Sequence, residues 1–232
     1  AWLERRLDLD RQAVSKIIWK EPALFRPSID LLETKLVWLR EGLALEEPDI
    51  ARLVRSNPNV LSYSVEENLE PTVAWLQNRM KLDRKGVAAV VLSFPTILGL
   101  NPETNIEPKL AWLKESLDLD EELVLRVVTA QPTVLKYSSK SNLGPTLDFF
   151  GKELGGSREE IREAVVSNCR LLSASVTKRM IPRAAMIEKA GLGPPVFREH
   201  VNAIASYTDL HFLKWLHSLV LEQGIPPRRK LT

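Results

Sequence analysis

Few residues in this sequence could carry nucleophilic or metal-binding chemistry. The chain has three histidines, His200, His211 and His217, and one cysteine, Cys169. The histidine spacings do not place these side chains on one face of a helix, and no Glu-x-x-His pair accompanies them. A single cysteine forms neither an intrachain disulfide nor a cysteine-based metal cluster. We therefore interpret all four as structural residues and expect a non-enzymatic protein with no metal and no cofactor.

Basic side chains offer a different chemistry, the electrostatic binding of phosphate groups. The chain has 32 Lys and Arg against 30 Asp and Glu, a net charge of +2, so any such binding depends on where the charges lie. Residues 169–232 contain ten basic and four acidic residues, whereas residues 1–168 contain 22 and 26. The C-terminal third is therefore basic. Its basic side chains, with two that precede them, are Lys136, Lys140, Arg170, Lys178, Arg179, Arg183, Lys189, Arg198, Lys214, Arg228, Arg229 and Lys230.

The elements that would position these charges follow from an internal repeat. One series, at intervals of 36 or 37 residues, is Pro22, Pro58, Pro95 and Pro132, continued by Cys169. A second series, at intervals of 37, is Pro71, Pro108, Pro145 and Pro182. A third, at the same interval, is Trp38, Trp75, Trp112, Phe149 and Met186. A fixed period at several independent positions predicts a repeat fold. Because Phe and Met replace Trp in the third series, we favour core packing over base stacking for these tryptophans.

Each repeat predicts two helices joined by a turn. Apolar residues before the first proline recur at i, i+3 and i+4, as in Val87, Val90 and Val91, which is one face of a helix of about three turns. The proline ends this helix, and we expect a 3₁₀ turn after it. The second helix opens near the second proline, with expected N-caps at Asn68, Asn105 and Asn142. The predicted fold class is an all-α solenoid of stacked repeats.

The two ends of the chain depart from the repeat. The opening segment 2–10 matches the later part of a second helix, which predicts an earlier repeat upstream and exposed apolar surface at Leu3 and Leu7. After Leu192 the pattern decays, because Ala205 stands where a proline is expected. We therefore expect about five repeats in residues 1–193, the first of them truncated, and a degenerate capping repeat with a basic tail in residues 194–232.

Two sets of cations occupy equivalent positions in different repeats. Lys16, Arg52 and Arg126 stand six residues before the first proline, where Ala89 and Glu163 complete the column. Stacking turns such a column into a stripe that is either a solvated face or a path for phosphates, and we weigh the two equally. The second set lies in the turn and at the start of the second helix, where we expect one shared edge. It contains Lys136, Lys140, Lys178, Arg179 and Arg183, and Arg198 completes the candidate sites.

The order of motifs within a repeat is distinctive. Leu-x-Leu precedes the amphipathic helix, Pro-x-Val/Ile/Leu-Leu follows it, and Asn-Leu/Ile-x-Pro-x-Leu-x-Trp-Leu opens the second helix, with the fullest copies at residues 45–76 and 82–113. This pattern resembles the mTERF family, the mitochondrial transcription termination factors and their plastid relatives. The resemblance covers roughly residues 7–193, and residues 62–69 look most like the algal and plant branch.

The resemblance implies a curved superhelical solenoid whose concave basic path holds nucleic acid in a mitochondrion or a chloroplast. It favours double-stranded DNA, with a role in transcription termination or regulation. RNA is the alternative within nucleic acids, as rRNA in ribosome assembly or as an intron in splicing. From a different class, a protein-binding scaffold without nucleic acid contact is the other alternative. We expect a monomer, and no membrane partner because no apolar run approaches 18 residues.

Overall fold

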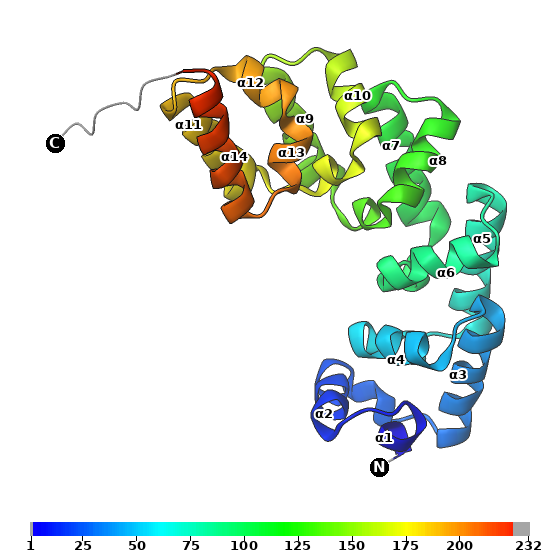
Figure 1. Cartoon of the computed structure of the whole chain (residues 1–232). Coiled ribbons are helices and arrows are strands. Elements are labelled where there is room, and N and C mark those ends of the chain that lie inside the picture. The colour runs from blue at the N-terminus through cyan, green and yellow to red at the C-terminus, as the bar shows by residue number, and fades with distance from the viewer. Residues whose placement is uncertain (1, 225–232) are drawn as a thin grey trace. The chain divides into compact units, whose positions relative to one another are not determined.

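The computed structural model of the chain describes residues 2–224, without the side chains of Phe25, Glu153, Pro194, Phe197, Arg198 and Ala203. The described residues form helices joined by short turns, with no β-strand among them, which confirms the all-α prediction (Figure 1). The chain divides into an N-terminal unit, Ala1–Pro108, and a C-terminal unit, Lys109–Thr232. The expected division after residue 193 concerns repeat character and stays a prediction, and the basic tail at residues 225–232 lies outside the described residues.

The N-terminal unit alternates a ten-residue first helix with a longer second helix. Its elements are α1 (Trp2–Arg6), α2 (Arg11–Lys20), η1 (Pro22–Phe25), α3 (Ile29–Leu43), α4 (Glu47–Ser56), η2 (Pro58–Leu61), η3 (Val65–Leu69), α5 (Glu70–Met80), α6 (Arg84–Ser93), η4 (Pro95–Gly99) and η5 (Pro102–Ile106). Each first helix stops at the residue before the repeat proline, where φ swings to about −138°, and a 3₁₀ turn follows. The predicted helix–turn–helix repeat is therefore present.

The C-terminal unit continues the same alternation and then changes. Its elements are α7 (Glu107–Leu117), α8 (Glu121–Ala130), η6 (Pro132–Lys136), η7 (Ser139–Leu143), α9 (Gly144–Asp148), η8 (Phe149–Glu153), α10 (Arg158–Ser167), η9 (Cys169–Ser173), η10 (Val176–Met180), α11 (Ile181–Lys189), α12 (Pro194–Glu199), α13 (Val201–Ser206) and α14 (Asp209–Glu222). Cys169 opens η9 in the place that proline takes elsewhere. After α11, three helices follow one another without a repeat proline.

The second helices begin earlier than the sequence predicts. After α3, each second helix opens with a wide π turn. The N-cap in the second repeat is Ser64, whose hydroxyl accepts from Glu67 N at 3.2 Å. Asn68 is therefore not the N-cap. Its side-chain oxygen accepts instead from the backbone N–H of Ser64 at 3.1 Å, and Asn105 and Asn142 repeat this bond. The N-cap prediction was wrong by four residues, because a side chain in the first turn can also bond backward to the capping residue.

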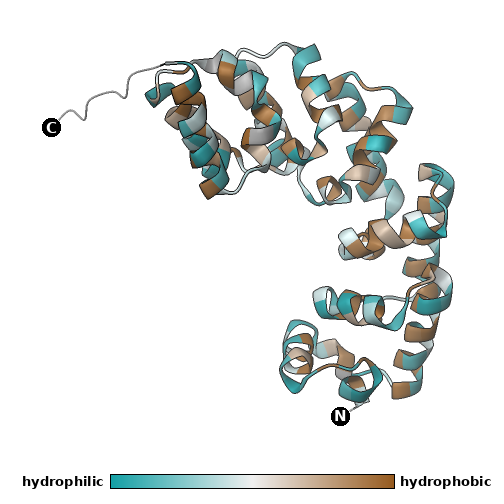
Figure 2. Cartoon of the chain, in the orientation of Figure 1, coloured by the Kyte–Doolittle hydropathy of each residue, from teal (hydrophilic) through white to brown (hydrophobic). Residues whose placement is uncertain are grey.

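Apolar stripes of facing helices form the core of each unit. Val54, Leu61 and Leu76 are fully buried in the N-terminal unit, and Val128, Leu135 and Val165 in the C-terminal unit. Figure 2 shows these apolar faces turned toward neighbouring helices and the polar faces turned outward. Leu7, which the repeat register predicts to be exposed, is buried at the end of α1, where α1 packs against α2. That prediction was wrong for Leu7.

The repeated tryptophans join consecutive second helices. Trp75 is half-buried, and its indole Nε1 donates to the Glu107 carboxylate at 3.2 Å. Trp38 makes the equivalent bond to Glu70 at 3.3 Å, and the Arg79 guanidinium pairs with Glu107 at 2.8 Å. These rings therefore pack between helices with a polar anchor, an arrangement that the hydrophobic pattern alone does not reveal.

Each second helix ends at a residue in the left-handed conformation. These residues, at intervals of 36 or 37, are Asp8, Ala44, Lys81, Asp118, Gly155 and Gly191. A residue with a Cβ costs roughly 1–2 kcal/mol in this conformation, whereas glycine adopts it freely. Four of the six helix ends therefore hold strain that the surrounding packing keeps in place.

We expect Ala44→Gly to raise the free energy of unfolding by roughly 1 kcal/mol, because glycine relieves the strain at φ 52°. Gly155→Ala should lower it by about the same amount, since the added Cβ meets nothing within 4 Å and only φ opposes it. Urea denaturation measures both changes. Ala89→Gly, at an exposed position inside α6, is the matched control and should cost about 0.5–1 kcal/mol. If Ala44→Gly lowered the free energy of unfolding as much as this control does, Ala44 would not be strained.

Candidate nucleic-acid interface

Four basic side chains gather where α2 packs against α4. Lys16 and Lys20 lie one turn apart on α2, Arg52 and Arg55 lie one turn apart on α4, and all four are exposed. They line a surface hollow of about 380 Å³, into which Asp10 also faces. The structure therefore brings Lys16 and Arg52 together as the column predicts. We call these four residues the α2–α4 patch.

The acidic groups beside the α2–α4 patch leave it positive. Asp49 pairs with the Arg52 guanidinium at 2.9 Å, and Asp10 caps α2 by accepting from Ala13 N at 2.6 Å. Both side chains of the Arg52–Asp49 pair are exposed, so water screens the pair and it contributes little to stability. A phosphate can therefore compete for the Arg52 guanidinium.

Sequence reasoning missed Lys20 and Arg55. Lys20 follows Lys16 by four residues, and Arg55 follows Arg52 by three, which are the spacings that place side chains on one helix face. The Lys20 ammonium also donates to the Arg55 carbonyl at 3.5 Å, which holds the end of α2 beside α4. Helical spacing around each cation of the column was the signal that could have found both.

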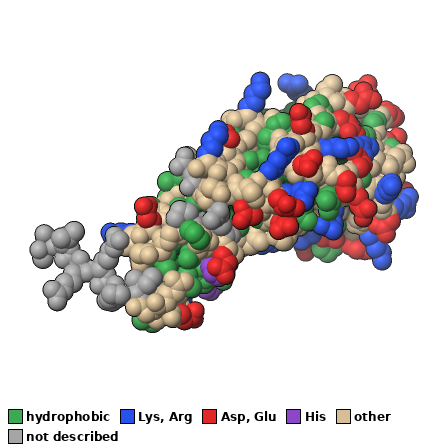
Figure 3. All heavy atoms as spheres, turned by 90° about the horizontal axis from the view of Figure 1, so that it is seen from above, with side chains coloured by type: hydrophobic (Ala, Val, Ile, Leu, Met, Phe, Trp, Pro, Cys, Tyr) green, Lys and Arg blue, Asp and Glu red, His purple; other side chains and the backbone are tan. Residues whose placement is uncertain are grey.

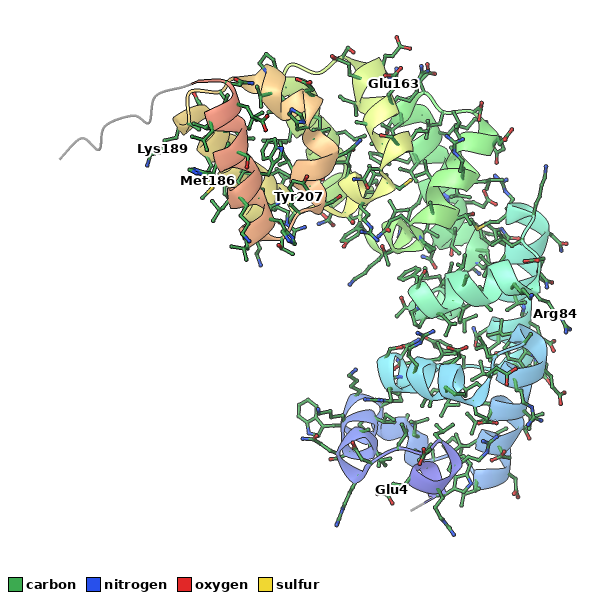
Figure 4. All side chains as sticks on the ribbon, viewed as in Figure 1. Glu4, Arg84, Glu163, Met186, Lys189 and Tyr207 are labelled. Carbon is green, nitrogen blue, oxygen red and sulfur yellow. The ribbon has the colours of Figure 1, made fainter. Side chains whose placement is uncertain are left out.

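Arg126 lies in the C-terminal unit, exposed on α8. With Arg170 it lines a hollow of about 330 Å³ that also includes Cys169. Burial raises the pKa of the Cys169 thiol, and the charge of Arg126 opposes this shift only in part, so the thiol stays protonated and a poor nucleophile. The next residue of the column, Glu163 on α10, is an exposed acid (Figure 4). Arg126 therefore belongs to a smaller basic site, and the basic column does not continue beyond it, because the next position holds Glu163.

Three exposed lysines lie in the turns of two consecutive repeats of the C-terminal unit. Lys136 ends η6, Lys140 lies in η7, and Lys178 lies in η10; their ammonium groups have no partner within the described residues. Residues from η7, η9 and η10, including Ser141, Ser173 and Thr177, line a hollow of about 300 Å³. We call the three lysines the turn patch. The lining of the hollow does not include the three lysines, but Ser141 and Thr177 adjoin Lys140 and Lys178 in sequence. Hydroxyl groups and lysines both suit phosphate oxygens.

Arg179 and Arg183 differ from these lysines although they share the same segment. Arg179 is exposed, but its Nη1 donates to the Ala205 carbonyl at 3.1 Å. The Arg183 side chain is only 4% exposed and stacks on the Phe212 ring at 4.8 Å. Its guanidinium donates to the carbonyls of Ile204 and Tyr207 and to Asp209. Because these donors bond within the protein, we leave Arg183 out of the candidate interface.

The position of Arg183 in the repeat explains its burial. Polar residues recur there every 37 residues, directly after the second proline in most repeats, and four of the five are buried: Lys35, Thr72, Thr146 and Arg183, with Lys109 half-buried. Lys35 donates to the Leu61 carbonyl at 2.6 Å, and Lys109 donates to the equivalent Leu135. Burial lowers the pKa of both lysines. We call this series the polar column. The side chain of Arg198 lies outside the described residues.

The face of the molecule seen in Figure 3 has mixed charge. On the face that Figure 3 shows, Lys and Arg side chains are interspersed with Asp and Glu. Among the described residues, no three His, Cys, Asp or Glu side chains come together as a metal site. The helices in the same part of the chain are too short or too polar to cross a membrane. The α2–α4 patch of the N-terminal unit and the turn patch of the C-terminal unit are therefore two separate candidate interfaces.

Comparison with known families gave one match. A family model described as mTERF matches residues 3–79 and 74–178, which together span more than half of the chain. The matched segments include both patches. Comparison with curated proteins gave no match.

We expect Arg183→Ala to lower the free energy of unfolding by roughly 2–4 kcal/mol, because two buried carbonyls lose their donor. Lys178→Ala, five residues earlier and exposed, should leave it unchanged. Thermal unfolding compares the two variants. Equal melting temperatures would show that Arg183 does not hold α13 and α14 in place and would return it to the candidate interface.

Proposed function

Because this chain belongs to the mTERF family, we propose that it is a non-enzymatic factor of organelle gene expression that binds double-stranded DNA and regulates or terminates transcription. The organelle is a mitochondrion or a chloroplast. The observation that carries the proposal is the α2–α4 patch, where two first helices place four exposed cations around one hollow. The turn patch adds three unpaired lysines in the C-terminal unit.

The chemistry of both patches favours the nucleic acid backbone over base edges. Lysine binds phosphate as a point charge. Exposed arginines on the surface of a helix donate hydrogen bonds to a phosphate in several orientations. Each neutralised phosphate releases condensed counterions, whatever the base. We therefore expect binding that depends weakly on sequence and strongly on salt.

Two alternatives keep specific support. RNA presents the same phosphates, so the patches fit an rRNA or intron ligand equally well in charge. A protein-binding scaffold is supported by the mixed charge of the face in Figure 3. The family's role in transcription favours the DNA duplex.

The test measures affinity for matched duplex DNA, duplex RNA and single strands over a range of salt concentrations. We expect Lys16→Ala, Arg52→Ala and Lys178→Ala each to weaken binding to all sequences about equally. Each should also make the slope of log affinity against log salt concentration shallower by about one unit, the contribution of one phosphate contact.

Arg84→Ala is the matched control, because Arg84 is an exposed cation at the start of α6, outside both patches (Figure 4). It should leave affinity and slope unchanged. Equal losses in Arg84→Ala and the patch variants would mean that net charge alone drives binding. Tighter binding of duplex RNA than of duplex DNA would favour the RNA alternative, and no binding of any nucleic acid would leave the protein scaffold.

A further inference from the structure

A groove of about 720 Å³ lies between α9–η8 and α11, which belong to two consecutive second helices of the C-terminal unit. The side chains that line it are apolar except for Asp148, Lys152 and Glu188. Asp148 and Lys152 pair with each other at 3.0 Å. Glu188 is exposed and has no partner within the described residues. The groove therefore offers an apolar surface with one free carboxylate, which repels a nucleic acid backbone.

The repeat gives this groove a composition of its own. In the N-terminal unit, Trp38 and Trp75 each bond to a glutamate 32 residues later, which joins one second helix to the next. The same two positions at the groove hold Phe149 and Ile181, and both residues line it. Phenylalanine and isoleucine cannot make that hydrogen bond, and the Ile181 side chain is 47% exposed. An exposed isoleucine in an apolar groove indicates a surface for another element.

The outer face of α14 has the complementary chemistry. Leu210, Leu213 and Leu221 are 63%, 49% and 67% exposed, and their spacing of three and eleven residues places them on one face of the helix. Lys214, one turn after Leu210, lies on the same face, exposed and without a partner within the described residues. The inner face packs on the rest of the unit, where Phe212 is only 2% exposed. The helix therefore turns an apolar stripe and one free ammonium group outward.

We propose that the groove binds the outer face of α14 of a second copy of this chain. An apolar groove between helices binds an amphipathic helix through apolar side chains that recur along one face, and α14 supplies such a helix. The Glu188 carboxylate of one copy pairs with the Lys214 ammonium of the other, which sets the position of the helix in the groove. One contact thereby covers two apolar surfaces that are exposed in the single chain.

The proposal goes beyond the proposed function and does not depend on nucleic acid. It makes the chain an oligomer, in place of the monomer expected from the sequence. One helix in one groove is smaller than a standard interface of about 1,600 Å², so we expect an association in the roughly micromolar range.

The experiment measures self-association of the protein alone by analytical ultracentrifugation over a range of protein concentrations. Ile181→Asn alters the groove and leaves α14 intact, and Leu213→Asn does the reverse, so each variant alone should associate about 30-fold more weakly than wild type. An equimolar mixture of the two should regain association, because the intact groove of one variant can bind the intact α14 of the other. Leu31→Asn, which changes a 47% exposed side chain of α3, is the matched control and should associate as wild type does. Thermal unfolding checks that every variant is folded.

The charge pair gives a second test that changes only exposed side chains. Lys214→Glu should weaken association about 10-fold because it brings two like charges together, and Glu188→Lys in the same chain should restore it. Lys85→Glu, the same charge change at an exposed position of α6, should have no effect. A double variant as weak as Lys214→Glu would overturn the proposed position of α14 in the groove.

Two results would overturn the whole proposal. In the first, wild type stays monomeric at all concentrations, which leaves the proposed function untouched because nucleic acid binding is measured separately. In the second, Leu213→Asn abolishes association but the mixture with Ile181→Asn does not restore it, which would assign the contact to two α14 helices rather than to α14 and the groove.

Discussion

The stacking of repeats depends on the bonds that the cationic members of the polar column, Lys35, Lys109 and Arg183, make across repeat boundaries. A 3₁₀ turn leaves carbonyl groups without helical donors, and burying them unpaired would cost about 1–3 kcal/mol each. Lys35 meets this requirement across the repeat boundary by donating to the Leu61 carbonyl, and Lys109 does the same for Leu135. The second helix of one repeat is thereby held in register with the turn of the next. Apolar burial drives the stacking, but these bonds fix how far one repeat slides on another.

The same constraint separates structural cations from cations that are free to bind a ligand. Arg183 takes the place of Lys35 and Lys109 in the last copy of the column, and its donors bond to the segment between α13 and α14. Lys178 stands five residues earlier in the same basic cluster, yet it faces solvent. The basic C-terminal third is therefore part scaffold and part surface, so counting its charges overstates what is available to phosphate.

First and second helices consequently have different tasks. The second helices carry the Trp–Glu bonds and the cations of the polar column, which bond one repeat to the next. They also carry the left-handed helix ends. The first helices are short, and their outward faces take no part in these bonds. Such a face can vary from repeat to repeat without loss of stability, as Lys16, Arg52, Ala89, Arg126 and Glu163 do in one column. Variation of this kind lets a single scaffold acquire a local binding patch.

The sequence by itself determined the period, the helix–turn–helix repeat and the all-α class, because prolines and apolar spacing act locally and recur at 37 residues. It also placed Lys16 and Arg52 on one stripe, since equivalent positions of stacked repeats must align. Only the tertiary structure decided which side chains are free. Arg183 and Lys178 have similar charge and neighbouring positions, and their fates differ because carbonyls from a segment more than 20 residues away meet one and not the other. Burial of a charged group depends on such distant partners, and the residues beside it in the sequence do not indicate which partners it will meet.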